Sequence, residues 1–256
     1  ELRGTQRSRP MQDIINECGD LIQTGVKEII LTAENTTDYG QEYDHNQESG
    51  QKPAAEIKDK KDFTQLITKL AKSVEQNKIQ SDPTWLRFLY AHPESLSESL
   101  IYAVANQPNI CSYYDIPIQH ASGSILKKMG RPYKLEELYT LFDTIRRIDP
   151  AAALRTTLIT GFPSETEADF DILMQFIKDV RFDHLGVFIY SDSEDLKSYT
   201  FRDKVADKTA QIRHDRLMAA QKTISLSINK EHLGKTYDVL VEENPEPGLY
   251  IGRTMF

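Results

Sequence analysis

The sequence is poor in cysteine, which limits both its covalent framework and its redox setting. Cys18 and Cys111 are the two cysteines among 256 residues, they stand far apart, and neither belongs to a C-x-x-C pair. A disulfide framework is therefore excluded, and the reducing cytoplasm is the expected compartment. Cys18 falls on the apolar face of a predicted helix, where we interpret it as a small core residue.

Long apolar runs and surplus positive charge are also missing. No stretch of about 18 apolar residues is present, so no membrane-spanning helix is predicted. No charged-then-apolar leader opens the chain, so no secretory signal is predicted. The 39 acidic residues outnumber the 31 basic ones, which gives a net charge of −8. This balance argues against a general affinity for polyanions, although it leaves room for a local basic patch.

The common short motifs of phosphate binding and hydrolysis are absent as well. The chain contains no G-x-x-x-x-G-K-[ST], no G-x-G-x-x-G, no H-E-x-x-H and no G-x-S-x-G. Apolar residues nevertheless make up 39% of the chain, enough for one large domain or for a medium domain with a small one.

Helical and strand patterns alternate along most of the chain. The helical patterns cover 11–24, 62–76, 95–105, 134–147 and 165–180, and the strand patterns cover 28–33, 85–90, 112–118, 153–159 and 185–190. Parallel strands joined by helical crossovers give an α/β sheet, either open or rolled into a barrel. Because the series begins on a helix, a further strand is expected before it.

Two parts of the chain depart from this alternation. Residues 41–60 are polar without periodicity, and we interpret them as a mobile excursion. A long helix is predicted over 204–233, with Ile212, Leu217, Ile224 and Ile228 on its apolar face. The period-two pattern of 235–243 predicts a strand, and Pro245, Pro247 and Gly248 predict a turn into a second one. We interpret 235–256 as the opening hairpin of a small β domain.

The segment 158–170, LITGFPSETEADF, joins a predicted strand to a predicted helix. Gly161 and Pro163 interrupt the strand, and Ser164 with Glu167 matches the capping-box pattern. Such a turn is expected to expose a row of backbone N–H groups, so it is a candidate ligand site as well as a helix start.

Polar side chains follow each of the predicted strands. Because parallel strands direct their carboxyl ends to one edge, these groups are expected to converge there as a ligand site. They are Glu34, Asn35, His92, Gln119, His120 and Glu165. Each has a structural alternative: neutral core histidines, helix caps at Gln119 and Ser122, or an interaction of Glu165 with a helix dipole. Arg155, inside an apolar strand, needs a carboxylate partner from a ligand or from a neighbouring side chain.

Several motifs together resemble one enzyme family. GTQRSRP, GVKEIILTAENTTDYG, YYDIPIQHASGSILKKMGRP, LRTTLITGFPSETEADF and LGVFIYS stand in the order and spacing of the radical S-adenosylmethionine (SAM) methylthiotransferases. The resemblance covers most of 4–233 and implies a radical SAM core over 1–233, while 235–256 resembles the start of a TRAM domain. DIPIQHAS and KKMGRP resemble the branch that modifies an aspartate of a small-subunit ribosomal protein (RimO type).

This resemblance implies a partial TIM-like (β/α)6 barrel that binds SAM and, in the full-length protein, two 4Fe-4S clusters. Carried over to this sequence, Glu34 and Asn35 would lie near the methionine moiety, and Gln119 and His120 near the nucleoside. Arg155 would hold a carboxylate bidentately. Gly161, Phe162 and Glu165 would form the adenine-side turn, and Tyr190 completes the predicted cofactor-binding set.

The implied substrate is a basic loop of the ribosomal protein, and an electron donor is the implied partner. The alternatives are methylthiolation of a tRNA adenosine (MiaB type) and a cluster-less barrel that acts as a binding module. The family's C-x-x-x-C-x-x-C motif should precede GTQRSRP and does not occur in this chain, so we expect a fragment whose cluster ligands lie elsewhere. Glu34 replaces a usual Gln, Ser164 a usual Gly, and YSDSEDLKS the usual YSPEEGT.

Overall fold

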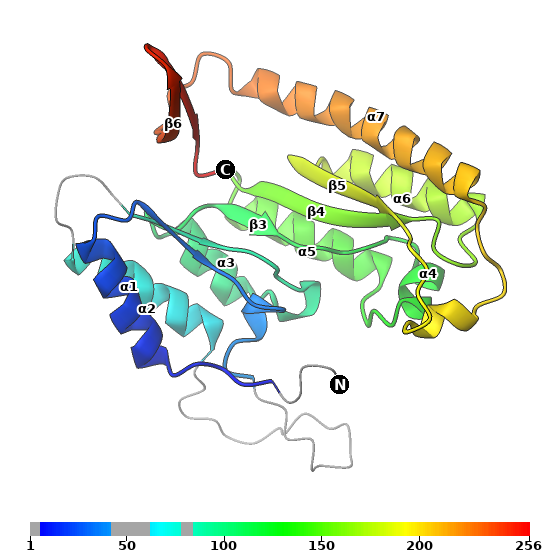
Figure 1. Ribbon diagram of the computed structural model, residues 1–256, viewed down its shortest axis with the longest axis horizontal. Coiled ribbons are helices and arrows are strands. Elements are labelled where there is room, and N and C mark those ends of the chain that lie inside the picture. Colours follow the sequence, from blue (N-terminus) through cyan, green and yellow to red (C-terminus); the bar gives the residue numbers. More distant parts are fainter. Residues whose placement is uncertain (1–5, 42–61, 78–83) are drawn as a thin grey trace. The chain divides into compact units, whose positions relative to one another are not determined.

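A computed structural model describes residues 6–41, 62–77 and 84–256 of the chain (Figure 1). Its described residues fall into two compact units, one formed by 1–90 and 95–111 and the other by 91–94 and 112–256. The excursion predicted over 41–60 lies almost entirely outside the described residues. Within the described part of the chain, no helix has both the length and the apolar character needed to cross a membrane.

The first unit is built from three helices and a pair of parallel strands. Its elements are α1 (Met11–Gln23), β1 (Glu28–Leu31), a 3-10 turn (Thr36–Asp38), α2 (Phe63–Gln76), β2 (Trp85–Phe88) and α3 (Glu98–Ala105). α2 and α3 start where the side chains of Asp62 and Ser97 accept backbone N–H groups, as N-caps do. Cys18 is buried on α1, as predicted.

The second unit contains a parallel sheet in the order β3–β4–β5, with helices between its strands. Its elements are β3 (Tyr113–Asp115), α4 (Gly123–Lys128), α5 (Leu135–Ile148), β4 (Ala153–Thr160), α6 (Glu167–Val180), β5 (His184–Ile189), a 3-10 turn (Lys197–Thr200), α7 (Asp207–Glu231), β6 (Leu240–Glu246) and β7 (Leu249–Arg253). A further 3-10 turn covers Pro93–Ser95. The predicted alternation of strands and helices is confirmed, although α4 was not predicted.

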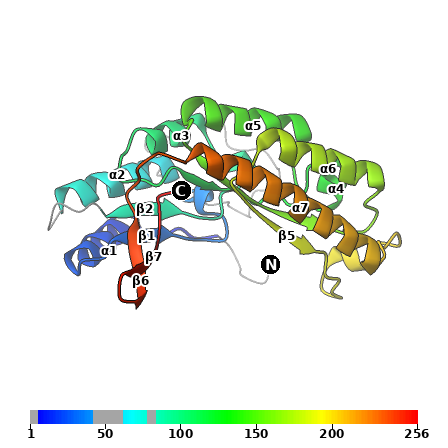
Figure 2. The ribbon, with the colours of Figure 1, turned by 90° about the horizontal axis from the view of Figure 1, so that it is seen from above.

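The two faces of the β3–β4–β5 sheet differ. Leu154, Thr156, Leu158 and Thr160 of β4 are buried, on the face that α5 and α6 cover (Figures 1 and 2). Arg155 and the other alternate residues of β4 are more exposed and lie on the opposite face, which we call the inner face. A fully apolar strand would bury both faces, so the partly polar inner face marks the side available to a ligand.

The helical layer is held together by aromatic packing. Phe142 of α5 contacts both Phe176 of α6 and Phe182, the residue that leads into β5, in edge-on geometry or close to it. All three rings are buried. This cluster fixes α5 and α6 against the sheet and thereby fixes the loops that follow β3 and β4.

The apolar face predicted for α7 is partly wrong. Leu217 is buried, but Ile212 is half exposed. The buried residues are Ala210, Arg213, Leu217 and Gln221, which recur at helical spacing. Two of them are polar, which is why an apolar pattern alone did not find this face.

The C-terminal hairpin was predicted with the wrong bounds. β6 begins at Leu240 and continues through Pro245, which the sequence placed in the turn, and β6 and β7 pair antiparallel with irregular register. Val239, Val241, Leu249 and Ile251 remain about half exposed. The helix predicted from residue 95 likewise begins only at Glu98, after a 3-10 turn.

Candidate functional site

The turn after β4 is closed by its own hydrogen bonds. The N–H groups of Gly161 and Phe162 both donate to Glu165 Oε2, and the N–H of Glu165 donates to the carbonyl of Phe162 at 3.0 Å. Ser164 N donates to Asp203 O at 2.6 Å, and Pro163 has no N–H. The prediction of a row of exposed donors is therefore wrong, and contacts with a ligand must use carbonyl oxygens or side chains here.

The predicted capping box at Ser164 and Glu167 is also wrong. The N-cap of α6 is Thr166, whose side chain accepts from Asp169 N, while Asp169 Oδ2 accepts from Thr166 N at 3.0 Å. Ser164 lies before the helix with φ of 70°, in the left-handed region. A β-carbon is strained there, so glycine would adopt this backbone conformation more easily than serine does.

Glu165 is held by a second helix. It is buried, and Arg213 of α7 donates to its backbone carbonyl at 3.1 Å and lies 3.3 Å from its Oε1. Burial raises the pKa of the Glu165 carboxyl, whereas Arg213 and the N–H groups of Gly161 and Phe162 oppose that rise. The Glu165 side chain therefore stabilises the turn through contacts within the protein, and these contacts occupy its carboxylate.

Gly161 is required by the same contact with α7. Its φ is 77°, and a β-carbon at this position would come within 2.5 Å of Ala210 Cβ. Glycine therefore satisfies both the left-handed backbone and the close approach of the turn to the helix.

The loop after β3 places Gln119 in a strained backbone beside β4. Gln119 has φ of 68°, and its backbone is held by Thr157 O at 2.9 Å and by Ile159 N at 2.8 Å. A left-handed glutamine is uncommon, and such strain concentrates where side chains must be aimed at a ligand. Its amide makes no hydrogen bond with any residue that the structure describes.

His120, by contrast, is completely buried. Its Nδ1 accepts from Ser122 N at 2.9 Å, so the neutral ring carries its proton on Nε2, which finds no hydrogen-bond partner among the described residues. Burial lowers the pKa of His120 to about 4, with Asp169 and Arg213 acting in opposite directions. Its alternative interpretation as a neutral core histidine agrees with this environment.

Asp169 connects the loop after β3 to the start of α6. Its Oδ1 accepts from Ser122 Oγ at 2.5 Å and Ser124 Oγ at 2.6 Å. Burial alone would raise the pKa of Asp169, but the hydrogen bonds from Ser122, Ser124 and Thr166 together lower it. Through these hydrogen bonds, Asp169 fixes the two loops relative to each other.

Phe162 and Tyr190 form an aromatic wall next to this turn. Their ring centroids lie 5.1 Å apart at an interplanar angle of 73°, and Phe201 contacts Phe162 from the other side at 6.2 Å. The Tyr190 hydroxyl donates to Asp192 Oδ1 at 2.9 Å and also lies within hydrogen-bonding distance of Ser198 Oγ, at 2.8 Å. Two of the predicted site residues are thus brought together.

A row of ionisable side chains crosses the inner face of the sheet. Asp115 pairs in register with Arg155, and Arg155 pairs with His184 on the next strand. Arg155 Nε lies 3.6 Å from Asp115 Oδ1, and 46% of the Arg155 side chain is exposed. Arg155 is therefore not buried, although it lies inside an apolar strand, and the expected carboxylate partner is Asp115, a neighbouring side chain.

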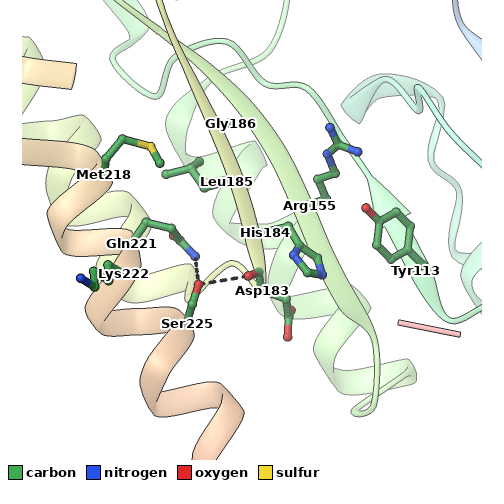
Figure 3. Close-up of a pocket in the computed structure, with 10 residues that line it drawn as sticks. All are labelled: Tyr113, Arg155, Asp183, His184, Leu185, Gly186, Met218, Gln221, Lys222 and Ser225. Carbon is green, nitrogen blue, oxygen red and sulfur yellow. Dashed lines mark hydrogen bonds between the residues drawn. The ribbon is translucent and has the colours of Figure 1, made fainter. Parts of the chain in front are cut away.

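This row opens into a cavity of about 480 Å³. The cavity is lined by Tyr113, Arg155, Asp183, His184, Leu185, Gly186, Met218, Gln221, Lys222 and Ser225 (Figure 3). Figure 3 shows Gln221 and Ser225 of α7 directed toward the start of β5, whereas Arg155 and Tyr113 lie away from α7. The cavity therefore reaches from the inner face to the long helix.

The structure does not gather all the predicted site residues of this unit at one point. Thr160, where β4 ends, lies five residue steps along the extended strand from Arg155, which corresponds to roughly 16 Å. Gly161, Phe162, Glu165 and Tyr190 cluster at that carboxyl end, and Gln119 lies beside Leu158, two residues before that end.

Of the other predicted residues, His92 belongs to the second unit and is partly buried, while Glu34 and Asn35 belong to the first unit. Glu34 is exposed in the loop after β1. Asn35 Oδ1 accepts from Thr37 Oγ1 at 2.9 Å and is approached by Ser95 Oγ at 3.5 Å. Asn35 therefore organises its own loop, and Glu34 is the more accessible of the two side chains.

Comparison with known proteins decides the family. The family model described as "Radical SAM superfamily" matches residues 1–177. The chain belongs to the radical SAM superfamily. Two curated relatives extend the similarity to nearly the whole chain, and both are ribosomal protein uS12 methylthiotransferases RimO. The protein from Desulfosudis oleivorans is 43% identical over 100% of this chain and 53% of its own length, and that from Clostridioides difficile is 41% identical over 99% and 52%.

This radical SAM chain therefore spans about half the length of the curated relatives it matches. Among solved structures, methylornithine synthase covers 84% of this chain with a TM-score of 0.50 and 13% identity, over 55% of its own length. That likeness concerns the fold alone. With the parallel sheets of both units, it confirms the predicted α/β class of the partial TIM-like type.

Sequence reasoning missed several residues that shape the candidate site. They are Asp115, Ser124, Asp169, His184 and Arg213. Asp115 could have been found as a second charge inside an apolar strand, like Arg155. Arg213 shares the helical spacing of Ala210 and Leu217, so a buried arginine was readable once the correct face was chosen.

Proposed function

We propose that this chain is the SAM-binding part of a methylthiotransferase that modifies an aspartate side chain of a small-subunit ribosomal protein. The observation that carries the proposal is the identity of 41–43% to two RimO proteins over essentially all of the chain. The reaction replaces one C–H hydrogen of the aspartate with a methylthio group.

The second unit offers suitable groups for SAM. Gln119 has a strained backbone and an amide without a described partner, as expected for a side chain aimed at a ligand. Phe162 and Tyr190 provide an apolar aromatic wall for a nucleoside, and Arg155 offers a half-exposed guanidinium for a carboxylate. In the first unit, Glu34 and Asn35 remain proposed neighbours of the methionine moiety.

The chain's own residues do not fit a 4Fe-4S cluster. Both cysteines are buried and separate, and no described group of three or more His, Cys, Asp and Glu residues is arranged to hold a metal. We therefore assign the cluster ligands to segments of the full-length protein outside these 256 residues, and we derive no chemical step through the clusters. An external electron donor and a cytoplasmic location complete the proposal.

The domain assignment is part of the same proposal. Residues 1–233 would form the radical SAM core, and 235–256 would begin a TRAM domain. The half-exposed apolar side chains of the β6–β7 hairpin support this, because an isolated two-stranded hairpin cannot bury them by itself.

Charge favours a protein substrate over tRNA. The net charge is −8, and the segment from residue 235 carries the basic residues Lys235 and Arg253 against the acidic residues Asp238, Glu242, Glu243 and Glu246. Such a surface attracts a basic ribosomal protein and repels a polyanion.

The test uses the full-length protein, reconstituted anaerobically with iron and sulfide and reduced. It should release 5′-deoxyadenosine from SAM, and it should bind the ribosomal protein more tightly than tRNA at equal salt. Absence of SAM cleavage in iron-loaded protein would contradict the proposal of radical SAM chemistry. Salt-dependent tRNA binding at micromolar affinity or better would favour the tRNA alternative, and a loss of both activities would leave the binding-module alternative.

A further inference from the structure

We propose that Arg213 of α7 is a positioning residue for SAM, which acts through Glu165 to hold the turn after β4 in the conformation that presents Phe162 to the nucleoside. The inference rests on the proposed function, because it takes this turn to be part of the SAM site. It adds a residue outside the predicted cofactor-binding set, and it makes the ionised state of Glu165 a condition for tight binding of SAM.

The first observation is that Arg213 joins α7 to the turn and to the start of α6. Its Nη1 donates to the Glu165 carbonyl oxygen at 3.1 Å and lies 3.3 Å from Glu165 Oε1. Its Nη2 donates to Glu167 Oε2, on the first residue of α6, at 3.3 Å. The Arg213 side chain is 6% exposed, and that of Glu165 is fully buried. Loss of one member of such a buried pair leaves the other charge without a partner.

The second observation is what the Glu165 carboxylate holds. Its Oε2 accepts from the N–H groups of Gly161 and Phe162, the two residues that follow β4. A charged acceptor binds N–H groups about twice as strongly as a neutral one. The Phe162 backbone carries the ring that contacts Tyr190 at a centroid distance of 5.1 Å. The position of the aromatic wall therefore depends on an ionised Glu165.

The third observation is that Arg213 keeps this carboxylate ionised. Burial is the largest influence on the pKa of Glu165 and raises it, while Arg213 is the strongest of the groups that lower it. Glu165 Oε1 accepts no hydrogen bond within the part of the chain that the structure describes. Without Arg213, the pKa of Glu165 rises further, and the carboxyl takes up a proton at Oε1 as the pH falls. The two N–H groups then have a weaker acceptor, and the turn loosens.

Three further groups face this ion pair. Asp169 of α6 raises the pKa of Glu165, in the same direction as burial. His120, in the loop after β3, is neutral because burial lowers its pKa to about 4, and the nearby guanidinium contributes to that lowering. Asp203 meets the turn at Ser164. The test must therefore separate the titration of Glu165 from that of His120.

Arg216 provides a matched control on the same helix. It lies one turn after Arg213 and donates to Glu167 Oε1 at 2.6 Å. Among the described residues, it makes no hydrogen bond or ion pair with the turn 161–165. Arg216→Met therefore removes the same charge from α7 and leaves Glu165 paired.

The measurement is SAM binding by equilibrium dialysis to the iron-loaded full-length protein, without a reductant so that SAM stays intact. Arg213→Met should raise the Kd for SAM at least about fivefold at about pH 6 and less at about pH 8.5, each relative to the unmodified protein at the same pH. This ratio cancels the titration of SAM itself. The ratio should stay close to one in Arg216→Met, and it should not change with pH in Arg213→Lys, which keeps the charge. A pH-independent ratio in Arg213→Met would overturn the proposal.

Glu165→Gln separates the two titrating groups. It should weaken SAM binding by the same factor at every pH, because its amide oxygen is a neutral acceptor, and the double variant with Arg213→Met should lose the pH dependence. If the double variant retains it, the titrating group is His120 and the proposal is wrong. Circular dichroism checks that each variant folds. Where Arg213→Met does not fold, unchanged SAM affinity in Glu165→Gln would overturn the proposal instead.

Hydrogen exchange of the segment 158–166, measured by mass spectrometry without SAM, gives a readout that does not depend on the proposed function. Exchange in Arg213→Met should accelerate toward low pH, relative to the unmodified protein at the same pH. Unchanged exchange alongside weaker SAM binding would show that Arg213 does not act through the turn. If the unmodified protein binds no SAM, the proposed function fails and the role of Arg213 in SAM binding fails with it, whereas the exchange still reports whether Arg213 holds the turn.

Discussion

The buried ring of His120 is expected to make the stability of the protein depend on pH. It is enclosed between the loop after β3, Asp169 and Arg213, with Nε2 unpartnered among the described residues. Its folded-state pKa of about 4 lies below the ordinary value of 6.5. The unfolded chain therefore takes up a proton first as the pH falls.

The expected result is a loss of stability that begins near pH 6.5 and continues to about pH 4. His120 should contribute a slope of up to about 1.4 kcal/mol per pH unit, and its stabilisation is fully present above pH 6.5. Urea unfolding of His120→Gln should show a shallower pH dependence over that range. His92→Gln, which alters a partly buried histidine, is the control, and an unchanged slope in His120→Gln would contradict the assignment.

Ser164 has a strained backbone with φ of 70°, and its side chain makes little contact that could compensate for this strain. Its hydroxyl contacts Asp203 Oδ2 at 3.4 Å on the surface, while its backbone bond to Asp203 O needs no side chain. Ser164→Gly should therefore raise the free energy of unfolding by about 0.5–1 kcal/mol, the left-handed strain outweighing the added chain entropy.

Chemical denaturation at neutral pH measures this effect. Ser164→Ala is the matched control, because it removes the hydroxyl and keeps the strain. If the Gly variant proves less stable than the Ala variant, the backbone of Ser164 is not the source of strain.

At the scale of elements, the turn after β4 and helix α7 depend on each other. Gly161 approaches Ala210 so closely that a β-carbon would overlap at 2.5 Å. Gly161→Ala should cost about 2–4 kcal/mol, since overpacking adds to the left-handed penalty. The double variant with Ala210→Gly should recover at least about 1 kcal/mol of this loss, because it removes the overlap but keeps the backbone strain.

A double-mutant cycle by urea unfolding provides the measurement. Ala210→Gly alone should cost about 1 kcal/mol as a glycine in a helix. Strict additivity of the two changes would show that the turn does not rest on α7.

The elements also show what sequence could and could not predict. The periodic spacing of apolar residues predicted the bounds of α1, α2, α5 and β4 to within about two residues. It succeeded because the apolar faces of these elements are buried, as such spacing requires. The pattern failed where buried groups are polar: it predicted the face of α7 only in part, because Arg213 and Gln221 occupy buried positions beside Leu217.

The candidate site was predicted less completely than the fold. The resemblance pointed to the residues around the turn. No local sequence pattern, however, predicts that the Glu165 carboxylate accepts hydrogen bonds from two N–H groups of its own turn. Asp115 and His184 escaped notice because their relation to Arg155 arises from the register of three strands far apart in the sequence. Such partners are fixed by tertiary pairing, which a single sequence does not display.

At the scale of the whole molecule, superfamily membership, a net charge of −8 and a half-length match to RimO proteins give one consistent proposal. The described residues have a fold of the radical SAM type, and the chain spans about half the length of its RimO relatives. Under the proposed function, the cluster ligands belong to the rest of the full-length protein.

The most direct measurement is mass spectrometry of ribosomal protein uS12 after incubation with the reconstituted full-length protein, SAM and a reductant, with tRNA treated in parallel. The account predicts one methylthio group in place of one hydrogen on an aspartate of the ribosomal protein and no modified adenosine. A methylthiolated tRNA adenosine with unmodified ribosomal protein would contradict it.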